Sequence, residues 1–238
     1  MGLKESGLRG SLRNVSVGID AIPDSGDLHI RYSAKEIDAS EDDTITTFDE
    51  LVADENMDGE GTFRETGING HPAVEVDNAD QGSGSGNGFQ TDLTSGISPP
   101  YHLFMAVNYP VTDAQTSDGI TSVNSDGLVG AVRDGPDNEL RWRGGDRDDI
   151  IFSHDVEPSI ISIGVPSSGN TVIRVNGSQV GSDDVGVQNW DVMTWGRRYD
   201  TDATDADLGE LLGYDTDKIG DESEFENYLS DEWSISLD

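Results

Sequence analysis

The chain of 238 residues has no cysteine, only three lysines, and an apolar content of 33%. Without cysteine there is no disulfide, no thiolate metal site and no cysteine nucleophile. No run of about 18 apolar residues occurs, so no segment has the composition of a membrane-spanning helix. The residues that follow Met1 do not lead into an apolar stretch. We therefore expect no secretory signal at this end of the chain.

Positive charge is also scarce, because 14 Lys and Arg stand against 48 Asp and Glu, for a formal charge of −34. Such a charge repels phosphate backbones, which makes nucleic acid an unexpected partner. The acidic residues are spread along the chain, and their mutual repulsion is screened when molar salt shortens the Debye length to about 3 Å. We infer a salt-adapted, haloarchaeal type of protein. The alternative, an acidic mesophilic protein that binds cations, would remain folded when salt is removed.

The N-terminal residues 1–27 differ from the rest of the chain in charge and residue composition. Residues 1–19 carry three basic residues and one acidic residue, a net charge of +2, so the other 219 residues carry −36. We interpret residues 1–27 as an extended arm that docks on a larger assembly, since a basic arm suits an acidic neighbour. A frayed terminus is the alternative. The residues that we expect to make the docking contacts are Lys4, Leu8, Arg9, Leu12 and Arg13.

Residues 28–238 have the residue pattern of one all-β domain. Short stretches rich in Val, Ile, Thr and aromatic residues recur between clusters of Gly, Asp, Asn and Pro. The nearly continuous apolar run at residues 101–107 predicts a strand that is buried on both faces. Asn176-Gly177 lies between two such stretches and predicts a type I′ hairpin. Many short strands with regular turns favour a jelly-roll sandwich.

Two segments interrupt this pattern. Residues 47–57 predict either a short helix or an irregular acidic stretch. Phe225, Tyr228 and Leu229 follow the i, i+3, i+4 spacing of an amphipathic helix. The sequence thus predicts one short helix near the C-terminal end of the domain.

Five segments, taken in order, resemble the LamG-like branch of the concanavalin A-like jelly rolls. They are the opening strand at 69–78 (NGHPAVEVDN), the strand at 138–143 (NELRWR), the hairpin at 173–180 (IRVNGSQV), the closing strand at 208–215 (LGELLGYD) and the terminal helix through 228–233 (YLSDEW). The resemblance covers about residues 28 to 237. It implies an all-β, concanavalin A-like (LamG) jelly-roll sandwich with a short C-terminal helix. This fold hosts lectins, adhesion domains and glucanases, so it does not fix the function.

The start of the chain adds a second resemblance. Residues 2–14 (GLKESGLRGSLRN) look like the opening of structural proteins from tailed viruses of haloarchaea. This implies a non-enzymatic virion surface protein, made in the host cytoplasm and extracellular in the mature particle. It would bind a host-surface glycan or S-layer glycoprotein during adsorption, as a homo-oligomer whose repeated copies supply avidity. The alternatives are a capsid or tail decoration without ligand, and a cellular haloarchaeal carbohydrate-binding protein or glycosidase.

Glycan binding needs an exposed aromatic ring with hydrogen-bonding side chains nearby. Trp190 precedes a predicted strand, so we expect it to be exposed, whereas Trp142, Trp195 and Trp233 are expected in the core. The arginines of this region could instead pair with surrounding carboxylates. The candidate glycan-binding residues are therefore Asn189, Trp190, Arg197, Arg198 and Tyr199.

Acidic clusters leave catalysis and metal binding open as alternatives. Glu75, Asp77 and Asp80 approach the carboxylate pattern of the glucanase branch, but a chain with 48 acidic residues produces such near-matches by chance. We expect no enzyme activity and no required cofactor. Calcium could bind oxygen ligands close together in sequence, although a salt-screened acidic surface explains them equally. The two candidate calcium clusters are Asp77, Asn78 and Asp80, and Asp146, Asp148 and Asp149.

Overall fold

A computed structural model of the chain describes residues 21–77, 88–109, 119–123, 130–133, 139–143, 149–153, 157–186, 188–197 and 205–238. The described strands are β1 (Leu28–Ser33), β2 (Thr44–Phe48), β3 (Met57–Ile68), β4 (His71–Val76), β5 (Gly88–Ile97), β6 (Tyr101–Asn108), β7 (Gly119–Ser122), β8 (Gly130–Arg133), β9 (Glu139–Trp142), β10 (Ile150–Ser153), β11 (Ser159–Val165), β12 (Thr171–Val175), β13 (Ser178–Asp183), β14 (Trp190–Trp195) and β15 (Ala206–Tyr214). One α-helix, α1 (Glu222–Trp233), follows them, with short 3-10 turns at Ser25–Asp27 and Ala34–Glu36. No helix within these residues is long and apolar enough to cross a bilayer.

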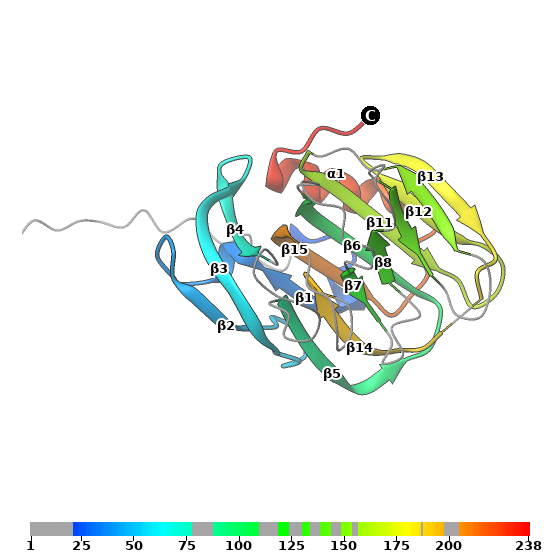
Figure 1. The fold of residues 1–238 in the computed structure, drawn as a ribbon. Coiled ribbons are helices and arrows are strands. Elements are labelled where there is room, and N and C mark those ends of the chain that lie inside the picture. The colour runs from blue at the N-terminus through cyan, green and yellow to red at the C-terminus, as the bar shows by residue number, and fades with distance from the viewer. Residues whose placement is uncertain are drawn as a thin grey trace, which may run out of the picture.

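The strands form one antiparallel sheet that curls into two layers (Figure 1). One layer, which we call the back sheet, holds β1, β15, β6, β11, β12 and β13. The front sheet holds β4, β3, β5, β14, β7, β8, β9 and β10. The layers join at β15, which pairs with β4 through Ala206–Leu208 and with β1 further along. The predicted all-β jelly-roll sandwich is confirmed.

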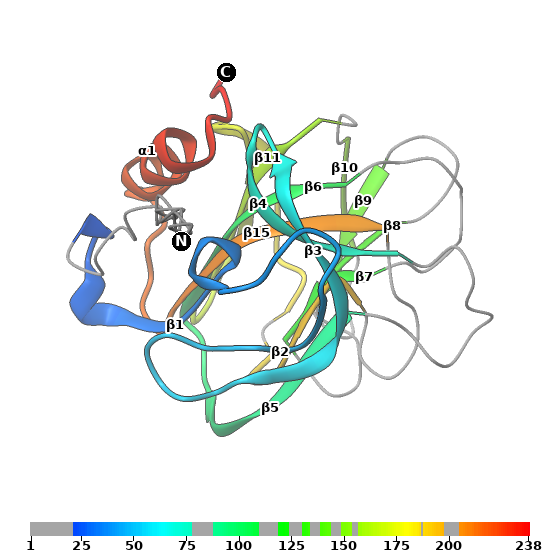
Figure 2. The same cartoon turned by 90° about the vertical axis from the view of Figure 1, so that its left-hand side faces the viewer.

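The core lies between the two sheets, and α1 covers the outer face of the back sheet. Figure 2 shows α1 on one side of the sandwich and β8, β9 and β10 on the opposite side. The ring of Phe225 stacks on Phe104 of β6 with 4.6 Å between ring centroids. This cover explains why every residue of β6 except Asn108 is buried, as the apolar run predicted. Trp142, Trp195 and Trp233 are fully buried, which confirms their assignment to the core.

A carboxylate inside the back sheet ties α1 to two strands. Glu210 of β15 is 1% exposed and accepts hydrogen bonds from Arg31 Nε at 2.7 Å and Trp233 Nε1 at 3.0 Å. Tyr228 Oη donates to the same carboxylate at 3.2 Å. Burial and the charge of Glu210 raise the pKa of Tyr228, which keeps the phenol protonated as a donor. The buried charge is therefore fully surrounded by donors, as a buried carboxylate requires.

The hairpin and the terminal helix are confirmed, whereas the helix alternative for residues 47–57 is wrong. Asn176 and Gly177 have φ values of 48° and 86°, as a type I′ turn demands. Residues 44–48 instead form β2, because Ile45 and Phe48 pair with β3 and point into the core. The segment from 49 to 56 is irregular, and Glu50 Oε2 accepts the backbone N–H of Val52 at 2.8 Å.

The last residues assigned to the arm belong to the packed body. Ile22 is 3% exposed, and Tyr214 Oη donates to the carbonyl of Pro23 at 2.9 Å. Lys218 Nζ lies 2.9 Å from Asp24 and 3.0 Å from Asp27. These contacts correct the predicted boundary at residue 27, which was placed from turn signals alone. The five expected docking residues, Lys4, Leu8, Arg9, Leu12 and Arg13, lie outside the described residues.

The buried His102 gives the fold a defined response to acid. Its ring stacks on Phe104 at 4.3 Å, and Nε2 lies 2.8 Å from Ser162 Oγ. Burial, assisted by Arg174 and Lys218, lowers its pKa to about 3. An unfolded histidine titrates near 6.5, so the unfolded state binds more protons below that pH. The stability that this neutral ring contributes is thus present above about pH 6.5 and is lost as the pH falls toward 3.

We predict that the wild-type chain loses about 3 kcal/mol more unfolding free energy than His102→Gln between about pH 7 and pH 4. Denaturant unfolding at constant high salt measures this difference. The matched control is His29→Gln, which changes a partly exposed histidine on β1. Parallel pH profiles for wild type and His102→Gln would contradict the assignment.

Candidate functional site

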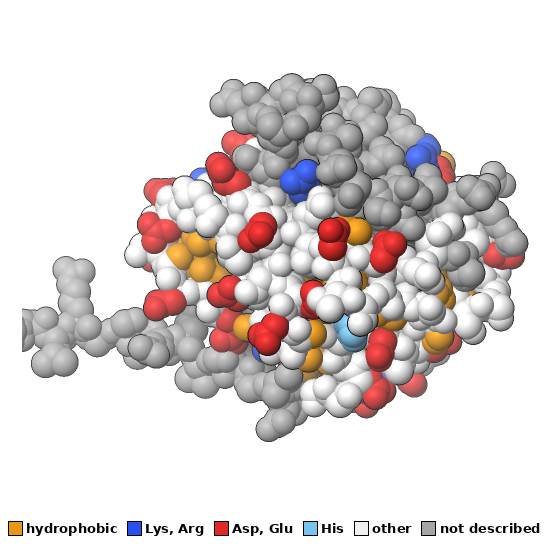
Figure 3. All heavy atoms as spheres, turned by 90° about the horizontal axis from the view of Figure 1, so that it is seen from below, with side chains coloured by type: hydrophobic (Ala, Val, Ile, Leu, Met, Phe, Trp, Pro, Cys, Tyr) orange, Lys and Arg blue, Asp and Glu red, His pale blue; other side chains and the backbone are white. Residues whose placement is uncertain are grey.

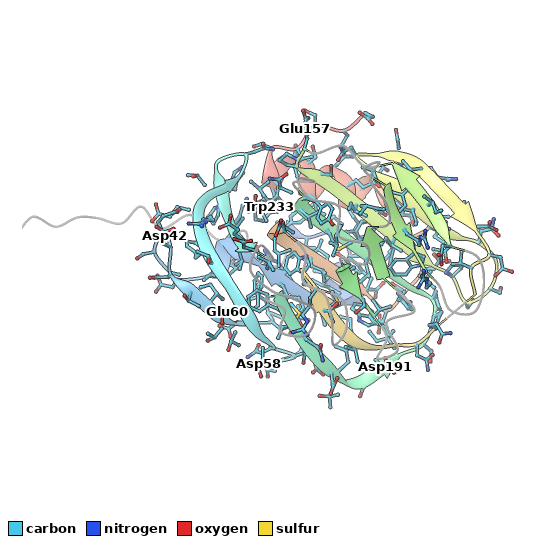
Figure 4. All side chains as sticks on the ribbon, viewed as in Figure 1. Asp42, Asp58, Glu60, Glu157, Asp191 and Trp233 are labelled. Atoms are coloured by element: carbon cyan, nitrogen blue, oxygen red, sulfur yellow. The ribbon has the colours of Figure 1, made fainter. Side chains whose placement is uncertain are left out.

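A groove with a volume of about 500 Å³ opens beside the C-terminal segment that follows α1. Figure 4 places Glu157 at this upper margin of the molecule. Four segments distant in sequence form its walls: the β3–β4 turn, the connection into β11, the β12–β13 hairpin and the C-terminal segment. The lining residues are Asn69, Glu157, Pro158, Ser159, Val175, Asn176, Val180, Ser234, Ile235, Ser236 and Asp238.

Asn176 is fixed in the groove through both its side chain and its backbone. Its Oδ1 accepts the backbone N–H of Ile160 at 2.8 Å, and its own N–H donates to the Ile160 carbonyl at 2.9 Å. Its carbonyl accepts the N–H of Asp238 at 2.8 Å, which draws the C-terminal segment against the hairpin. The side-chain amide Nδ2 has no hydrogen-bond partner within the described residues. The groove thus holds an oriented donor that is available to a ligand.

Asn69 plays a similar part on the opposite wall. Its Nδ2 donates to the carbonyl of Ser234 at 2.9 Å and to that of Trp233 at 3.3 Å. Both Asn69 and Ser234 have positive φ, 49° and 52°, at the β3–β4 turn and at the end of α1. The carboxamide therefore closes the free carbonyl end of the helix. Its Oδ1 has no partner among the described atoms and serves as an acceptor.

The remaining lining is aliphatic and acidic. Val175, Val180 and Ile235 supply apolar surface, and Glu157 and Asp238 supply the carboxylates. No Lys or Arg is among the lining residues. The nearby Arg174 is engaged elsewhere, because its guanidinium donates to Glu226 at 2.8 Å and to the Gly177 carbonyl. Carboxamides, hydroxyls and aliphatic faces can hold the hydroxyl-rich surface of a neutral sugar.

Ser234 and His71 are the only pair at the described rim of the groove that suggests nucleophilic catalysis. Ser234 Oγ lies 3.2 Å from His71 Nε2. Burial and the charge of Lys35 lower the pKa of His71. No carboxylate in the described chain accepts a hydrogen bond from the other ring nitrogen of His71. The pair therefore lacks the third group that orients a catalytic histidine.

The structure does not expose Trp190, and that expectation is wrong. The ring is 0% exposed and lies 5.6 Å from the ring of Tyr101. It fills the space above Gly213, where an added Cβ would come within 2.2 Å of the indole. Trp190 begins β14, where the pairing with β5 is irregular between Trp190 and Val192, and it is buried like Trp195. The sequence alternation did not reveal this irregular pairing.

The other candidate glycan-binding residues do not meet at one place. Asn189 is exposed before β14, whereas Arg197 is half-buried after its end. The two residues are eight positions apart, which corresponds to about 26 Å at about 3.3 Å per residue. Asp191 lies at the lower margin of the molecule in Figure 4, away from Glu157. Arg198 and Tyr199 lie outside the described residues.

The acidic candidates are largely paired with arginine where they are described. Arg64 Nε lies 2.6 Å from Glu75 Oε2, and Glu75 stands across from Asp207 on the neighbouring strand. Asp207 has a raised pKa because of burial, although Asn108 donates to it at 2.9 Å.

The second cluster follows the same rule, since Asp149 binds Arg141 at 2.9 Å and Arg143 at 3.0 Å. Both arginines are half-buried, whereas Trp142 between them is fully buried. Asp77 is exposed at the end of β4, and Asn78, Asp80, Asp146 and Asp148 lie outside the described residues. The described part of the chain holds no group of three His, Asp or Glu placed to bind a metal.

The sequence contained one unused signal for the groove. Asn69-Gly70 and Asn176-Gly177 are both Asn-Gly dipeptides, but the sequence pattern predicts a strand that opens at Asn69 and a hairpin turn only at Asn176-Gly177. The fold brings both to the C-terminal segment, because Asn69 binds Ser234 and Asn176 binds Asp238. Only the tertiary structure shows that these turns share one groove.

We predict that Trp190→Ala lowers the unfolding free energy by about 3–5 kcal/mol, as expected for removal of a fully buried aromatic ring. Asn189→Ala, one position earlier and exposed, should change it by less than about 0.5 kcal/mol. Denaturant unfolding in molar salt measures both. Equal, small effects of the two substitutions would show that Trp190 is not a core residue in solution.

Comparison with known proteins gives the fold alone. No protein-family model matches the chain. No curated protein matches it either. Among solved structures, the binding domain of Paraclostridial Mosquitocidal Protein 1 is 13% identical, with a TM-score of 0.61 over 86% of this chain and 52% of that one. The binding domain of botulinum neurotoxin DC, solved with rat synaptotagmin II, is 14% identical, with a TM-score of 0.56 over 86% and 52%.

An enzyme is among the neighbours as well. Trypanosoma rangeli sialidase in complex with the inhibitor DANA is 11% identical, with a TM-score of 0.61 over 86% of this chain and 33% of the sialidase. The chain thus spans about half of the matched toxin binding domains and about a third of the sialidase. At these identities the neighbours share its β-sandwich architecture.

Proposed function

We propose that the protein is a non-enzymatic binding module whose C-terminal groove holds a neutral glycan of a host surface. The supporting observation is the unpartnered Nδ2 of Asn176, held by three backbone hydrogen bonds around the same residue. A donor that is already oriented loses little freedom when a sugar hydroxyl binds it. Asn69 and the hydroxyl of Ser236 add an acceptor and a second polar contact on the other walls.

The charge around the groove selects against anionic ligands. Glu157 and Asp238 line it without a basic residue, in a chain whose formal charge is −34. Figure 3 shows acidic side chains scattered over another face as well, with few basic ones among the described residues. In molar salt the Debye length is about 3 Å, so long-range attraction contributes little to binding. Hydrogen bonds and aliphatic contacts to a neutral sugar then carry the affinity.

The wider setting that we propose is the surface of a virion of a haloarchaeal tailed virus. The support is the resemblance of residues 2–14 to structural proteins of such viruses. There the domain would bind host glycan or S-layer glycoprotein during adsorption. One shallow groove binds weakly, and many copies on one particle raise the effective concentration of sites. The toxin binding domains show that this sandwich supports surface-binding modules in other proteins.

We predict that Asn176→Asp weakens binding to haloarchaeal cells and to isolated S-layer glycoprotein at least about tenfold. Aspartate keeps the Oδ1 that fixes Ile160 and tolerates the positive φ, but it replaces the Nδ2 donor by an acceptor. The full chain is presented on beads in multi-molar salt, and bound cells and glycoprotein are quantified before and after deglycosylation.

Asn189→Asp is the matched control, because it makes the same change on the exposed segment before β14. Binding that survives in Asn176→Asp but is lost in Asn189→Asp would move the site to the β14 end. No binding by the wild-type chain would contradict the glycan-binding function and favour a structural decoration. Release of reducing sugar by the wild type would contradict the non-enzymatic assignment.

A further inference from the structure

The front sheet ends in a strand edge that is open in the described structure. β2 pairs only with β3, through contacts such as Thr44 with Thr62 and Phe48 with Met57. Within the described residues no backbone hydrogen bond is made from the other edge of β2. Thr46 falls in the register shift between Ile45 and Thr47, so it takes no part in the β3 register. β2 lies at the outer margin of the molecule in Figure 1.

This edge lacks the features that usually protect a terminal strand. Residues 44–48 (TITTF) contain no lysine, no proline and no charge, and the side chains of Thr44, Thr46 and Thr47 are exposed. The terminal strand of the back sheet, β13, is covered differently. Its Gly181 is packed by Ile150 of β10, where an added Cβ would lie 2.3 Å from the isoleucine. Among the described residues, the edge of β2 is therefore more open to a further strand than that of β13.

The chain carries a segment that suits this edge. Val15, Val17 and Ile19 alternate with Ser16 and Gly18, the period of a strand with one apolar face. This segment belongs to residues 1–20, outside the described structure. A chain of 20 residues spans at most about 70 Å, long enough to reach a neighbouring molecule.

Charge also favours this pairing. Lys4, Arg9 and Arg13 precede the alternating segment. On the body, Asp43 and Asp49 flank the two ends of β2 and have no basic partner in the described residues. A strand added at this edge would bring the basic residues that precede it close to these aspartates. Figure 4 labels Asp42, the neighbour of Asp43, in this part of the molecule.

We propose that residues 15–19 of one copy add as a strand to the free edge of β2 in a second copy. The backbone N–H and C=O groups of the open edge then gain hydrogen-bond partners. The side chains of Val15, Val17 and Ile19 lie along the exposed threonines of β2. Because each copy offers both a donor segment and an acceptor edge, two copies can exchange segments in a closed dimer, or successive copies can join head-to-tail into a ring or a filament. This assembly surface is independent of glycan binding in the groove.

The absence of cysteine allows a direct test by disulfide cross-linking of the full chain. Val17→Cys and Thr46→Cys are made as separate variants, mixed in molar salt and oxidised. We expect a covalent dimer that contains one copy of each variant. Ser178→Cys on the exposed β13 strand replaces Thr46→Cys as the control acceptor and should give at least about tenfold less of the mixed dimer.

A second measurement separates docking from random collision. Sedimentation velocity of Val17→Pro should show loss of the wild-type self-association, because proline removes a backbone donor outside the packed body. Val17→Ala, which keeps that donor, should still associate. Equal cross-linking to Thr46→Cys and Ser178→Cys would overturn the proposal. So would a Val17→Cys/Thr46→Cys double variant that closes only within one molecule, or a wild-type chain that remains monomeric.

Discussion

The buried carboxylate of Glu210 is the interaction on which the rest of the structure depends. It lies on β15, the strand where the two sheets join, and it accepts hydrogen bonds from Arg31 of β1 and from Tyr228 and Trp233 of α1. Loss of one partner would leave a buried charge without compensation, which makes the arrangement specific. The end of α1 is thereby fixed at Trp233, and the C-terminal segment continues from there along the groove.

Three further basic side chains hold this side of the molecule together. Arg174 binds Glu226 of α1, Lys35 lies over the ring of Trp233 at 4.7 Å, and Lys218 joins the segment before β1 to the loop before α1. The chain has 48 acidic residues and only 14 basic ones. None of the basic side chains that hold this side of the molecule together lines the groove. The shortage of positive charge thus favours a neutral over an anionic ligand in the proposed site.

Local patterns predicted the fold well, and long-range geometry limited what they predicted of the site. The run through β6, the Asn176-Gly177 turn and the helical spacing of Phe225 and Leu229 each express a preference contained in a few neighbouring residues. Trp190 was misplaced because the irregular pairing of β14 with β5 next to it is not visible in the alternation of the sequence. The groove could not be predicted because its walls come from four segments spread over residues 69–238, which meet only after α1 docks. For the same reason, the contact of Ile22 with the core could not be read from the turn that follows it.

The most direct test of the central claim is a crystal structure of the full chain grown with a neutral oligosaccharide released from a haloarchaeal S-layer glycoprotein. The account predicts sugar in the groove, with a hydroxyl accepting from Asn176 Nδ2 at about 2.9 Å and an aliphatic face against the exposed Val180. The hydrogen bonds of Asn176 to Ile160 and Asp238 should be unchanged, because the donor is already oriented. Sugar bound at the ends of β14, or an occupied groove in which Asn176 makes no contact, would contradict it.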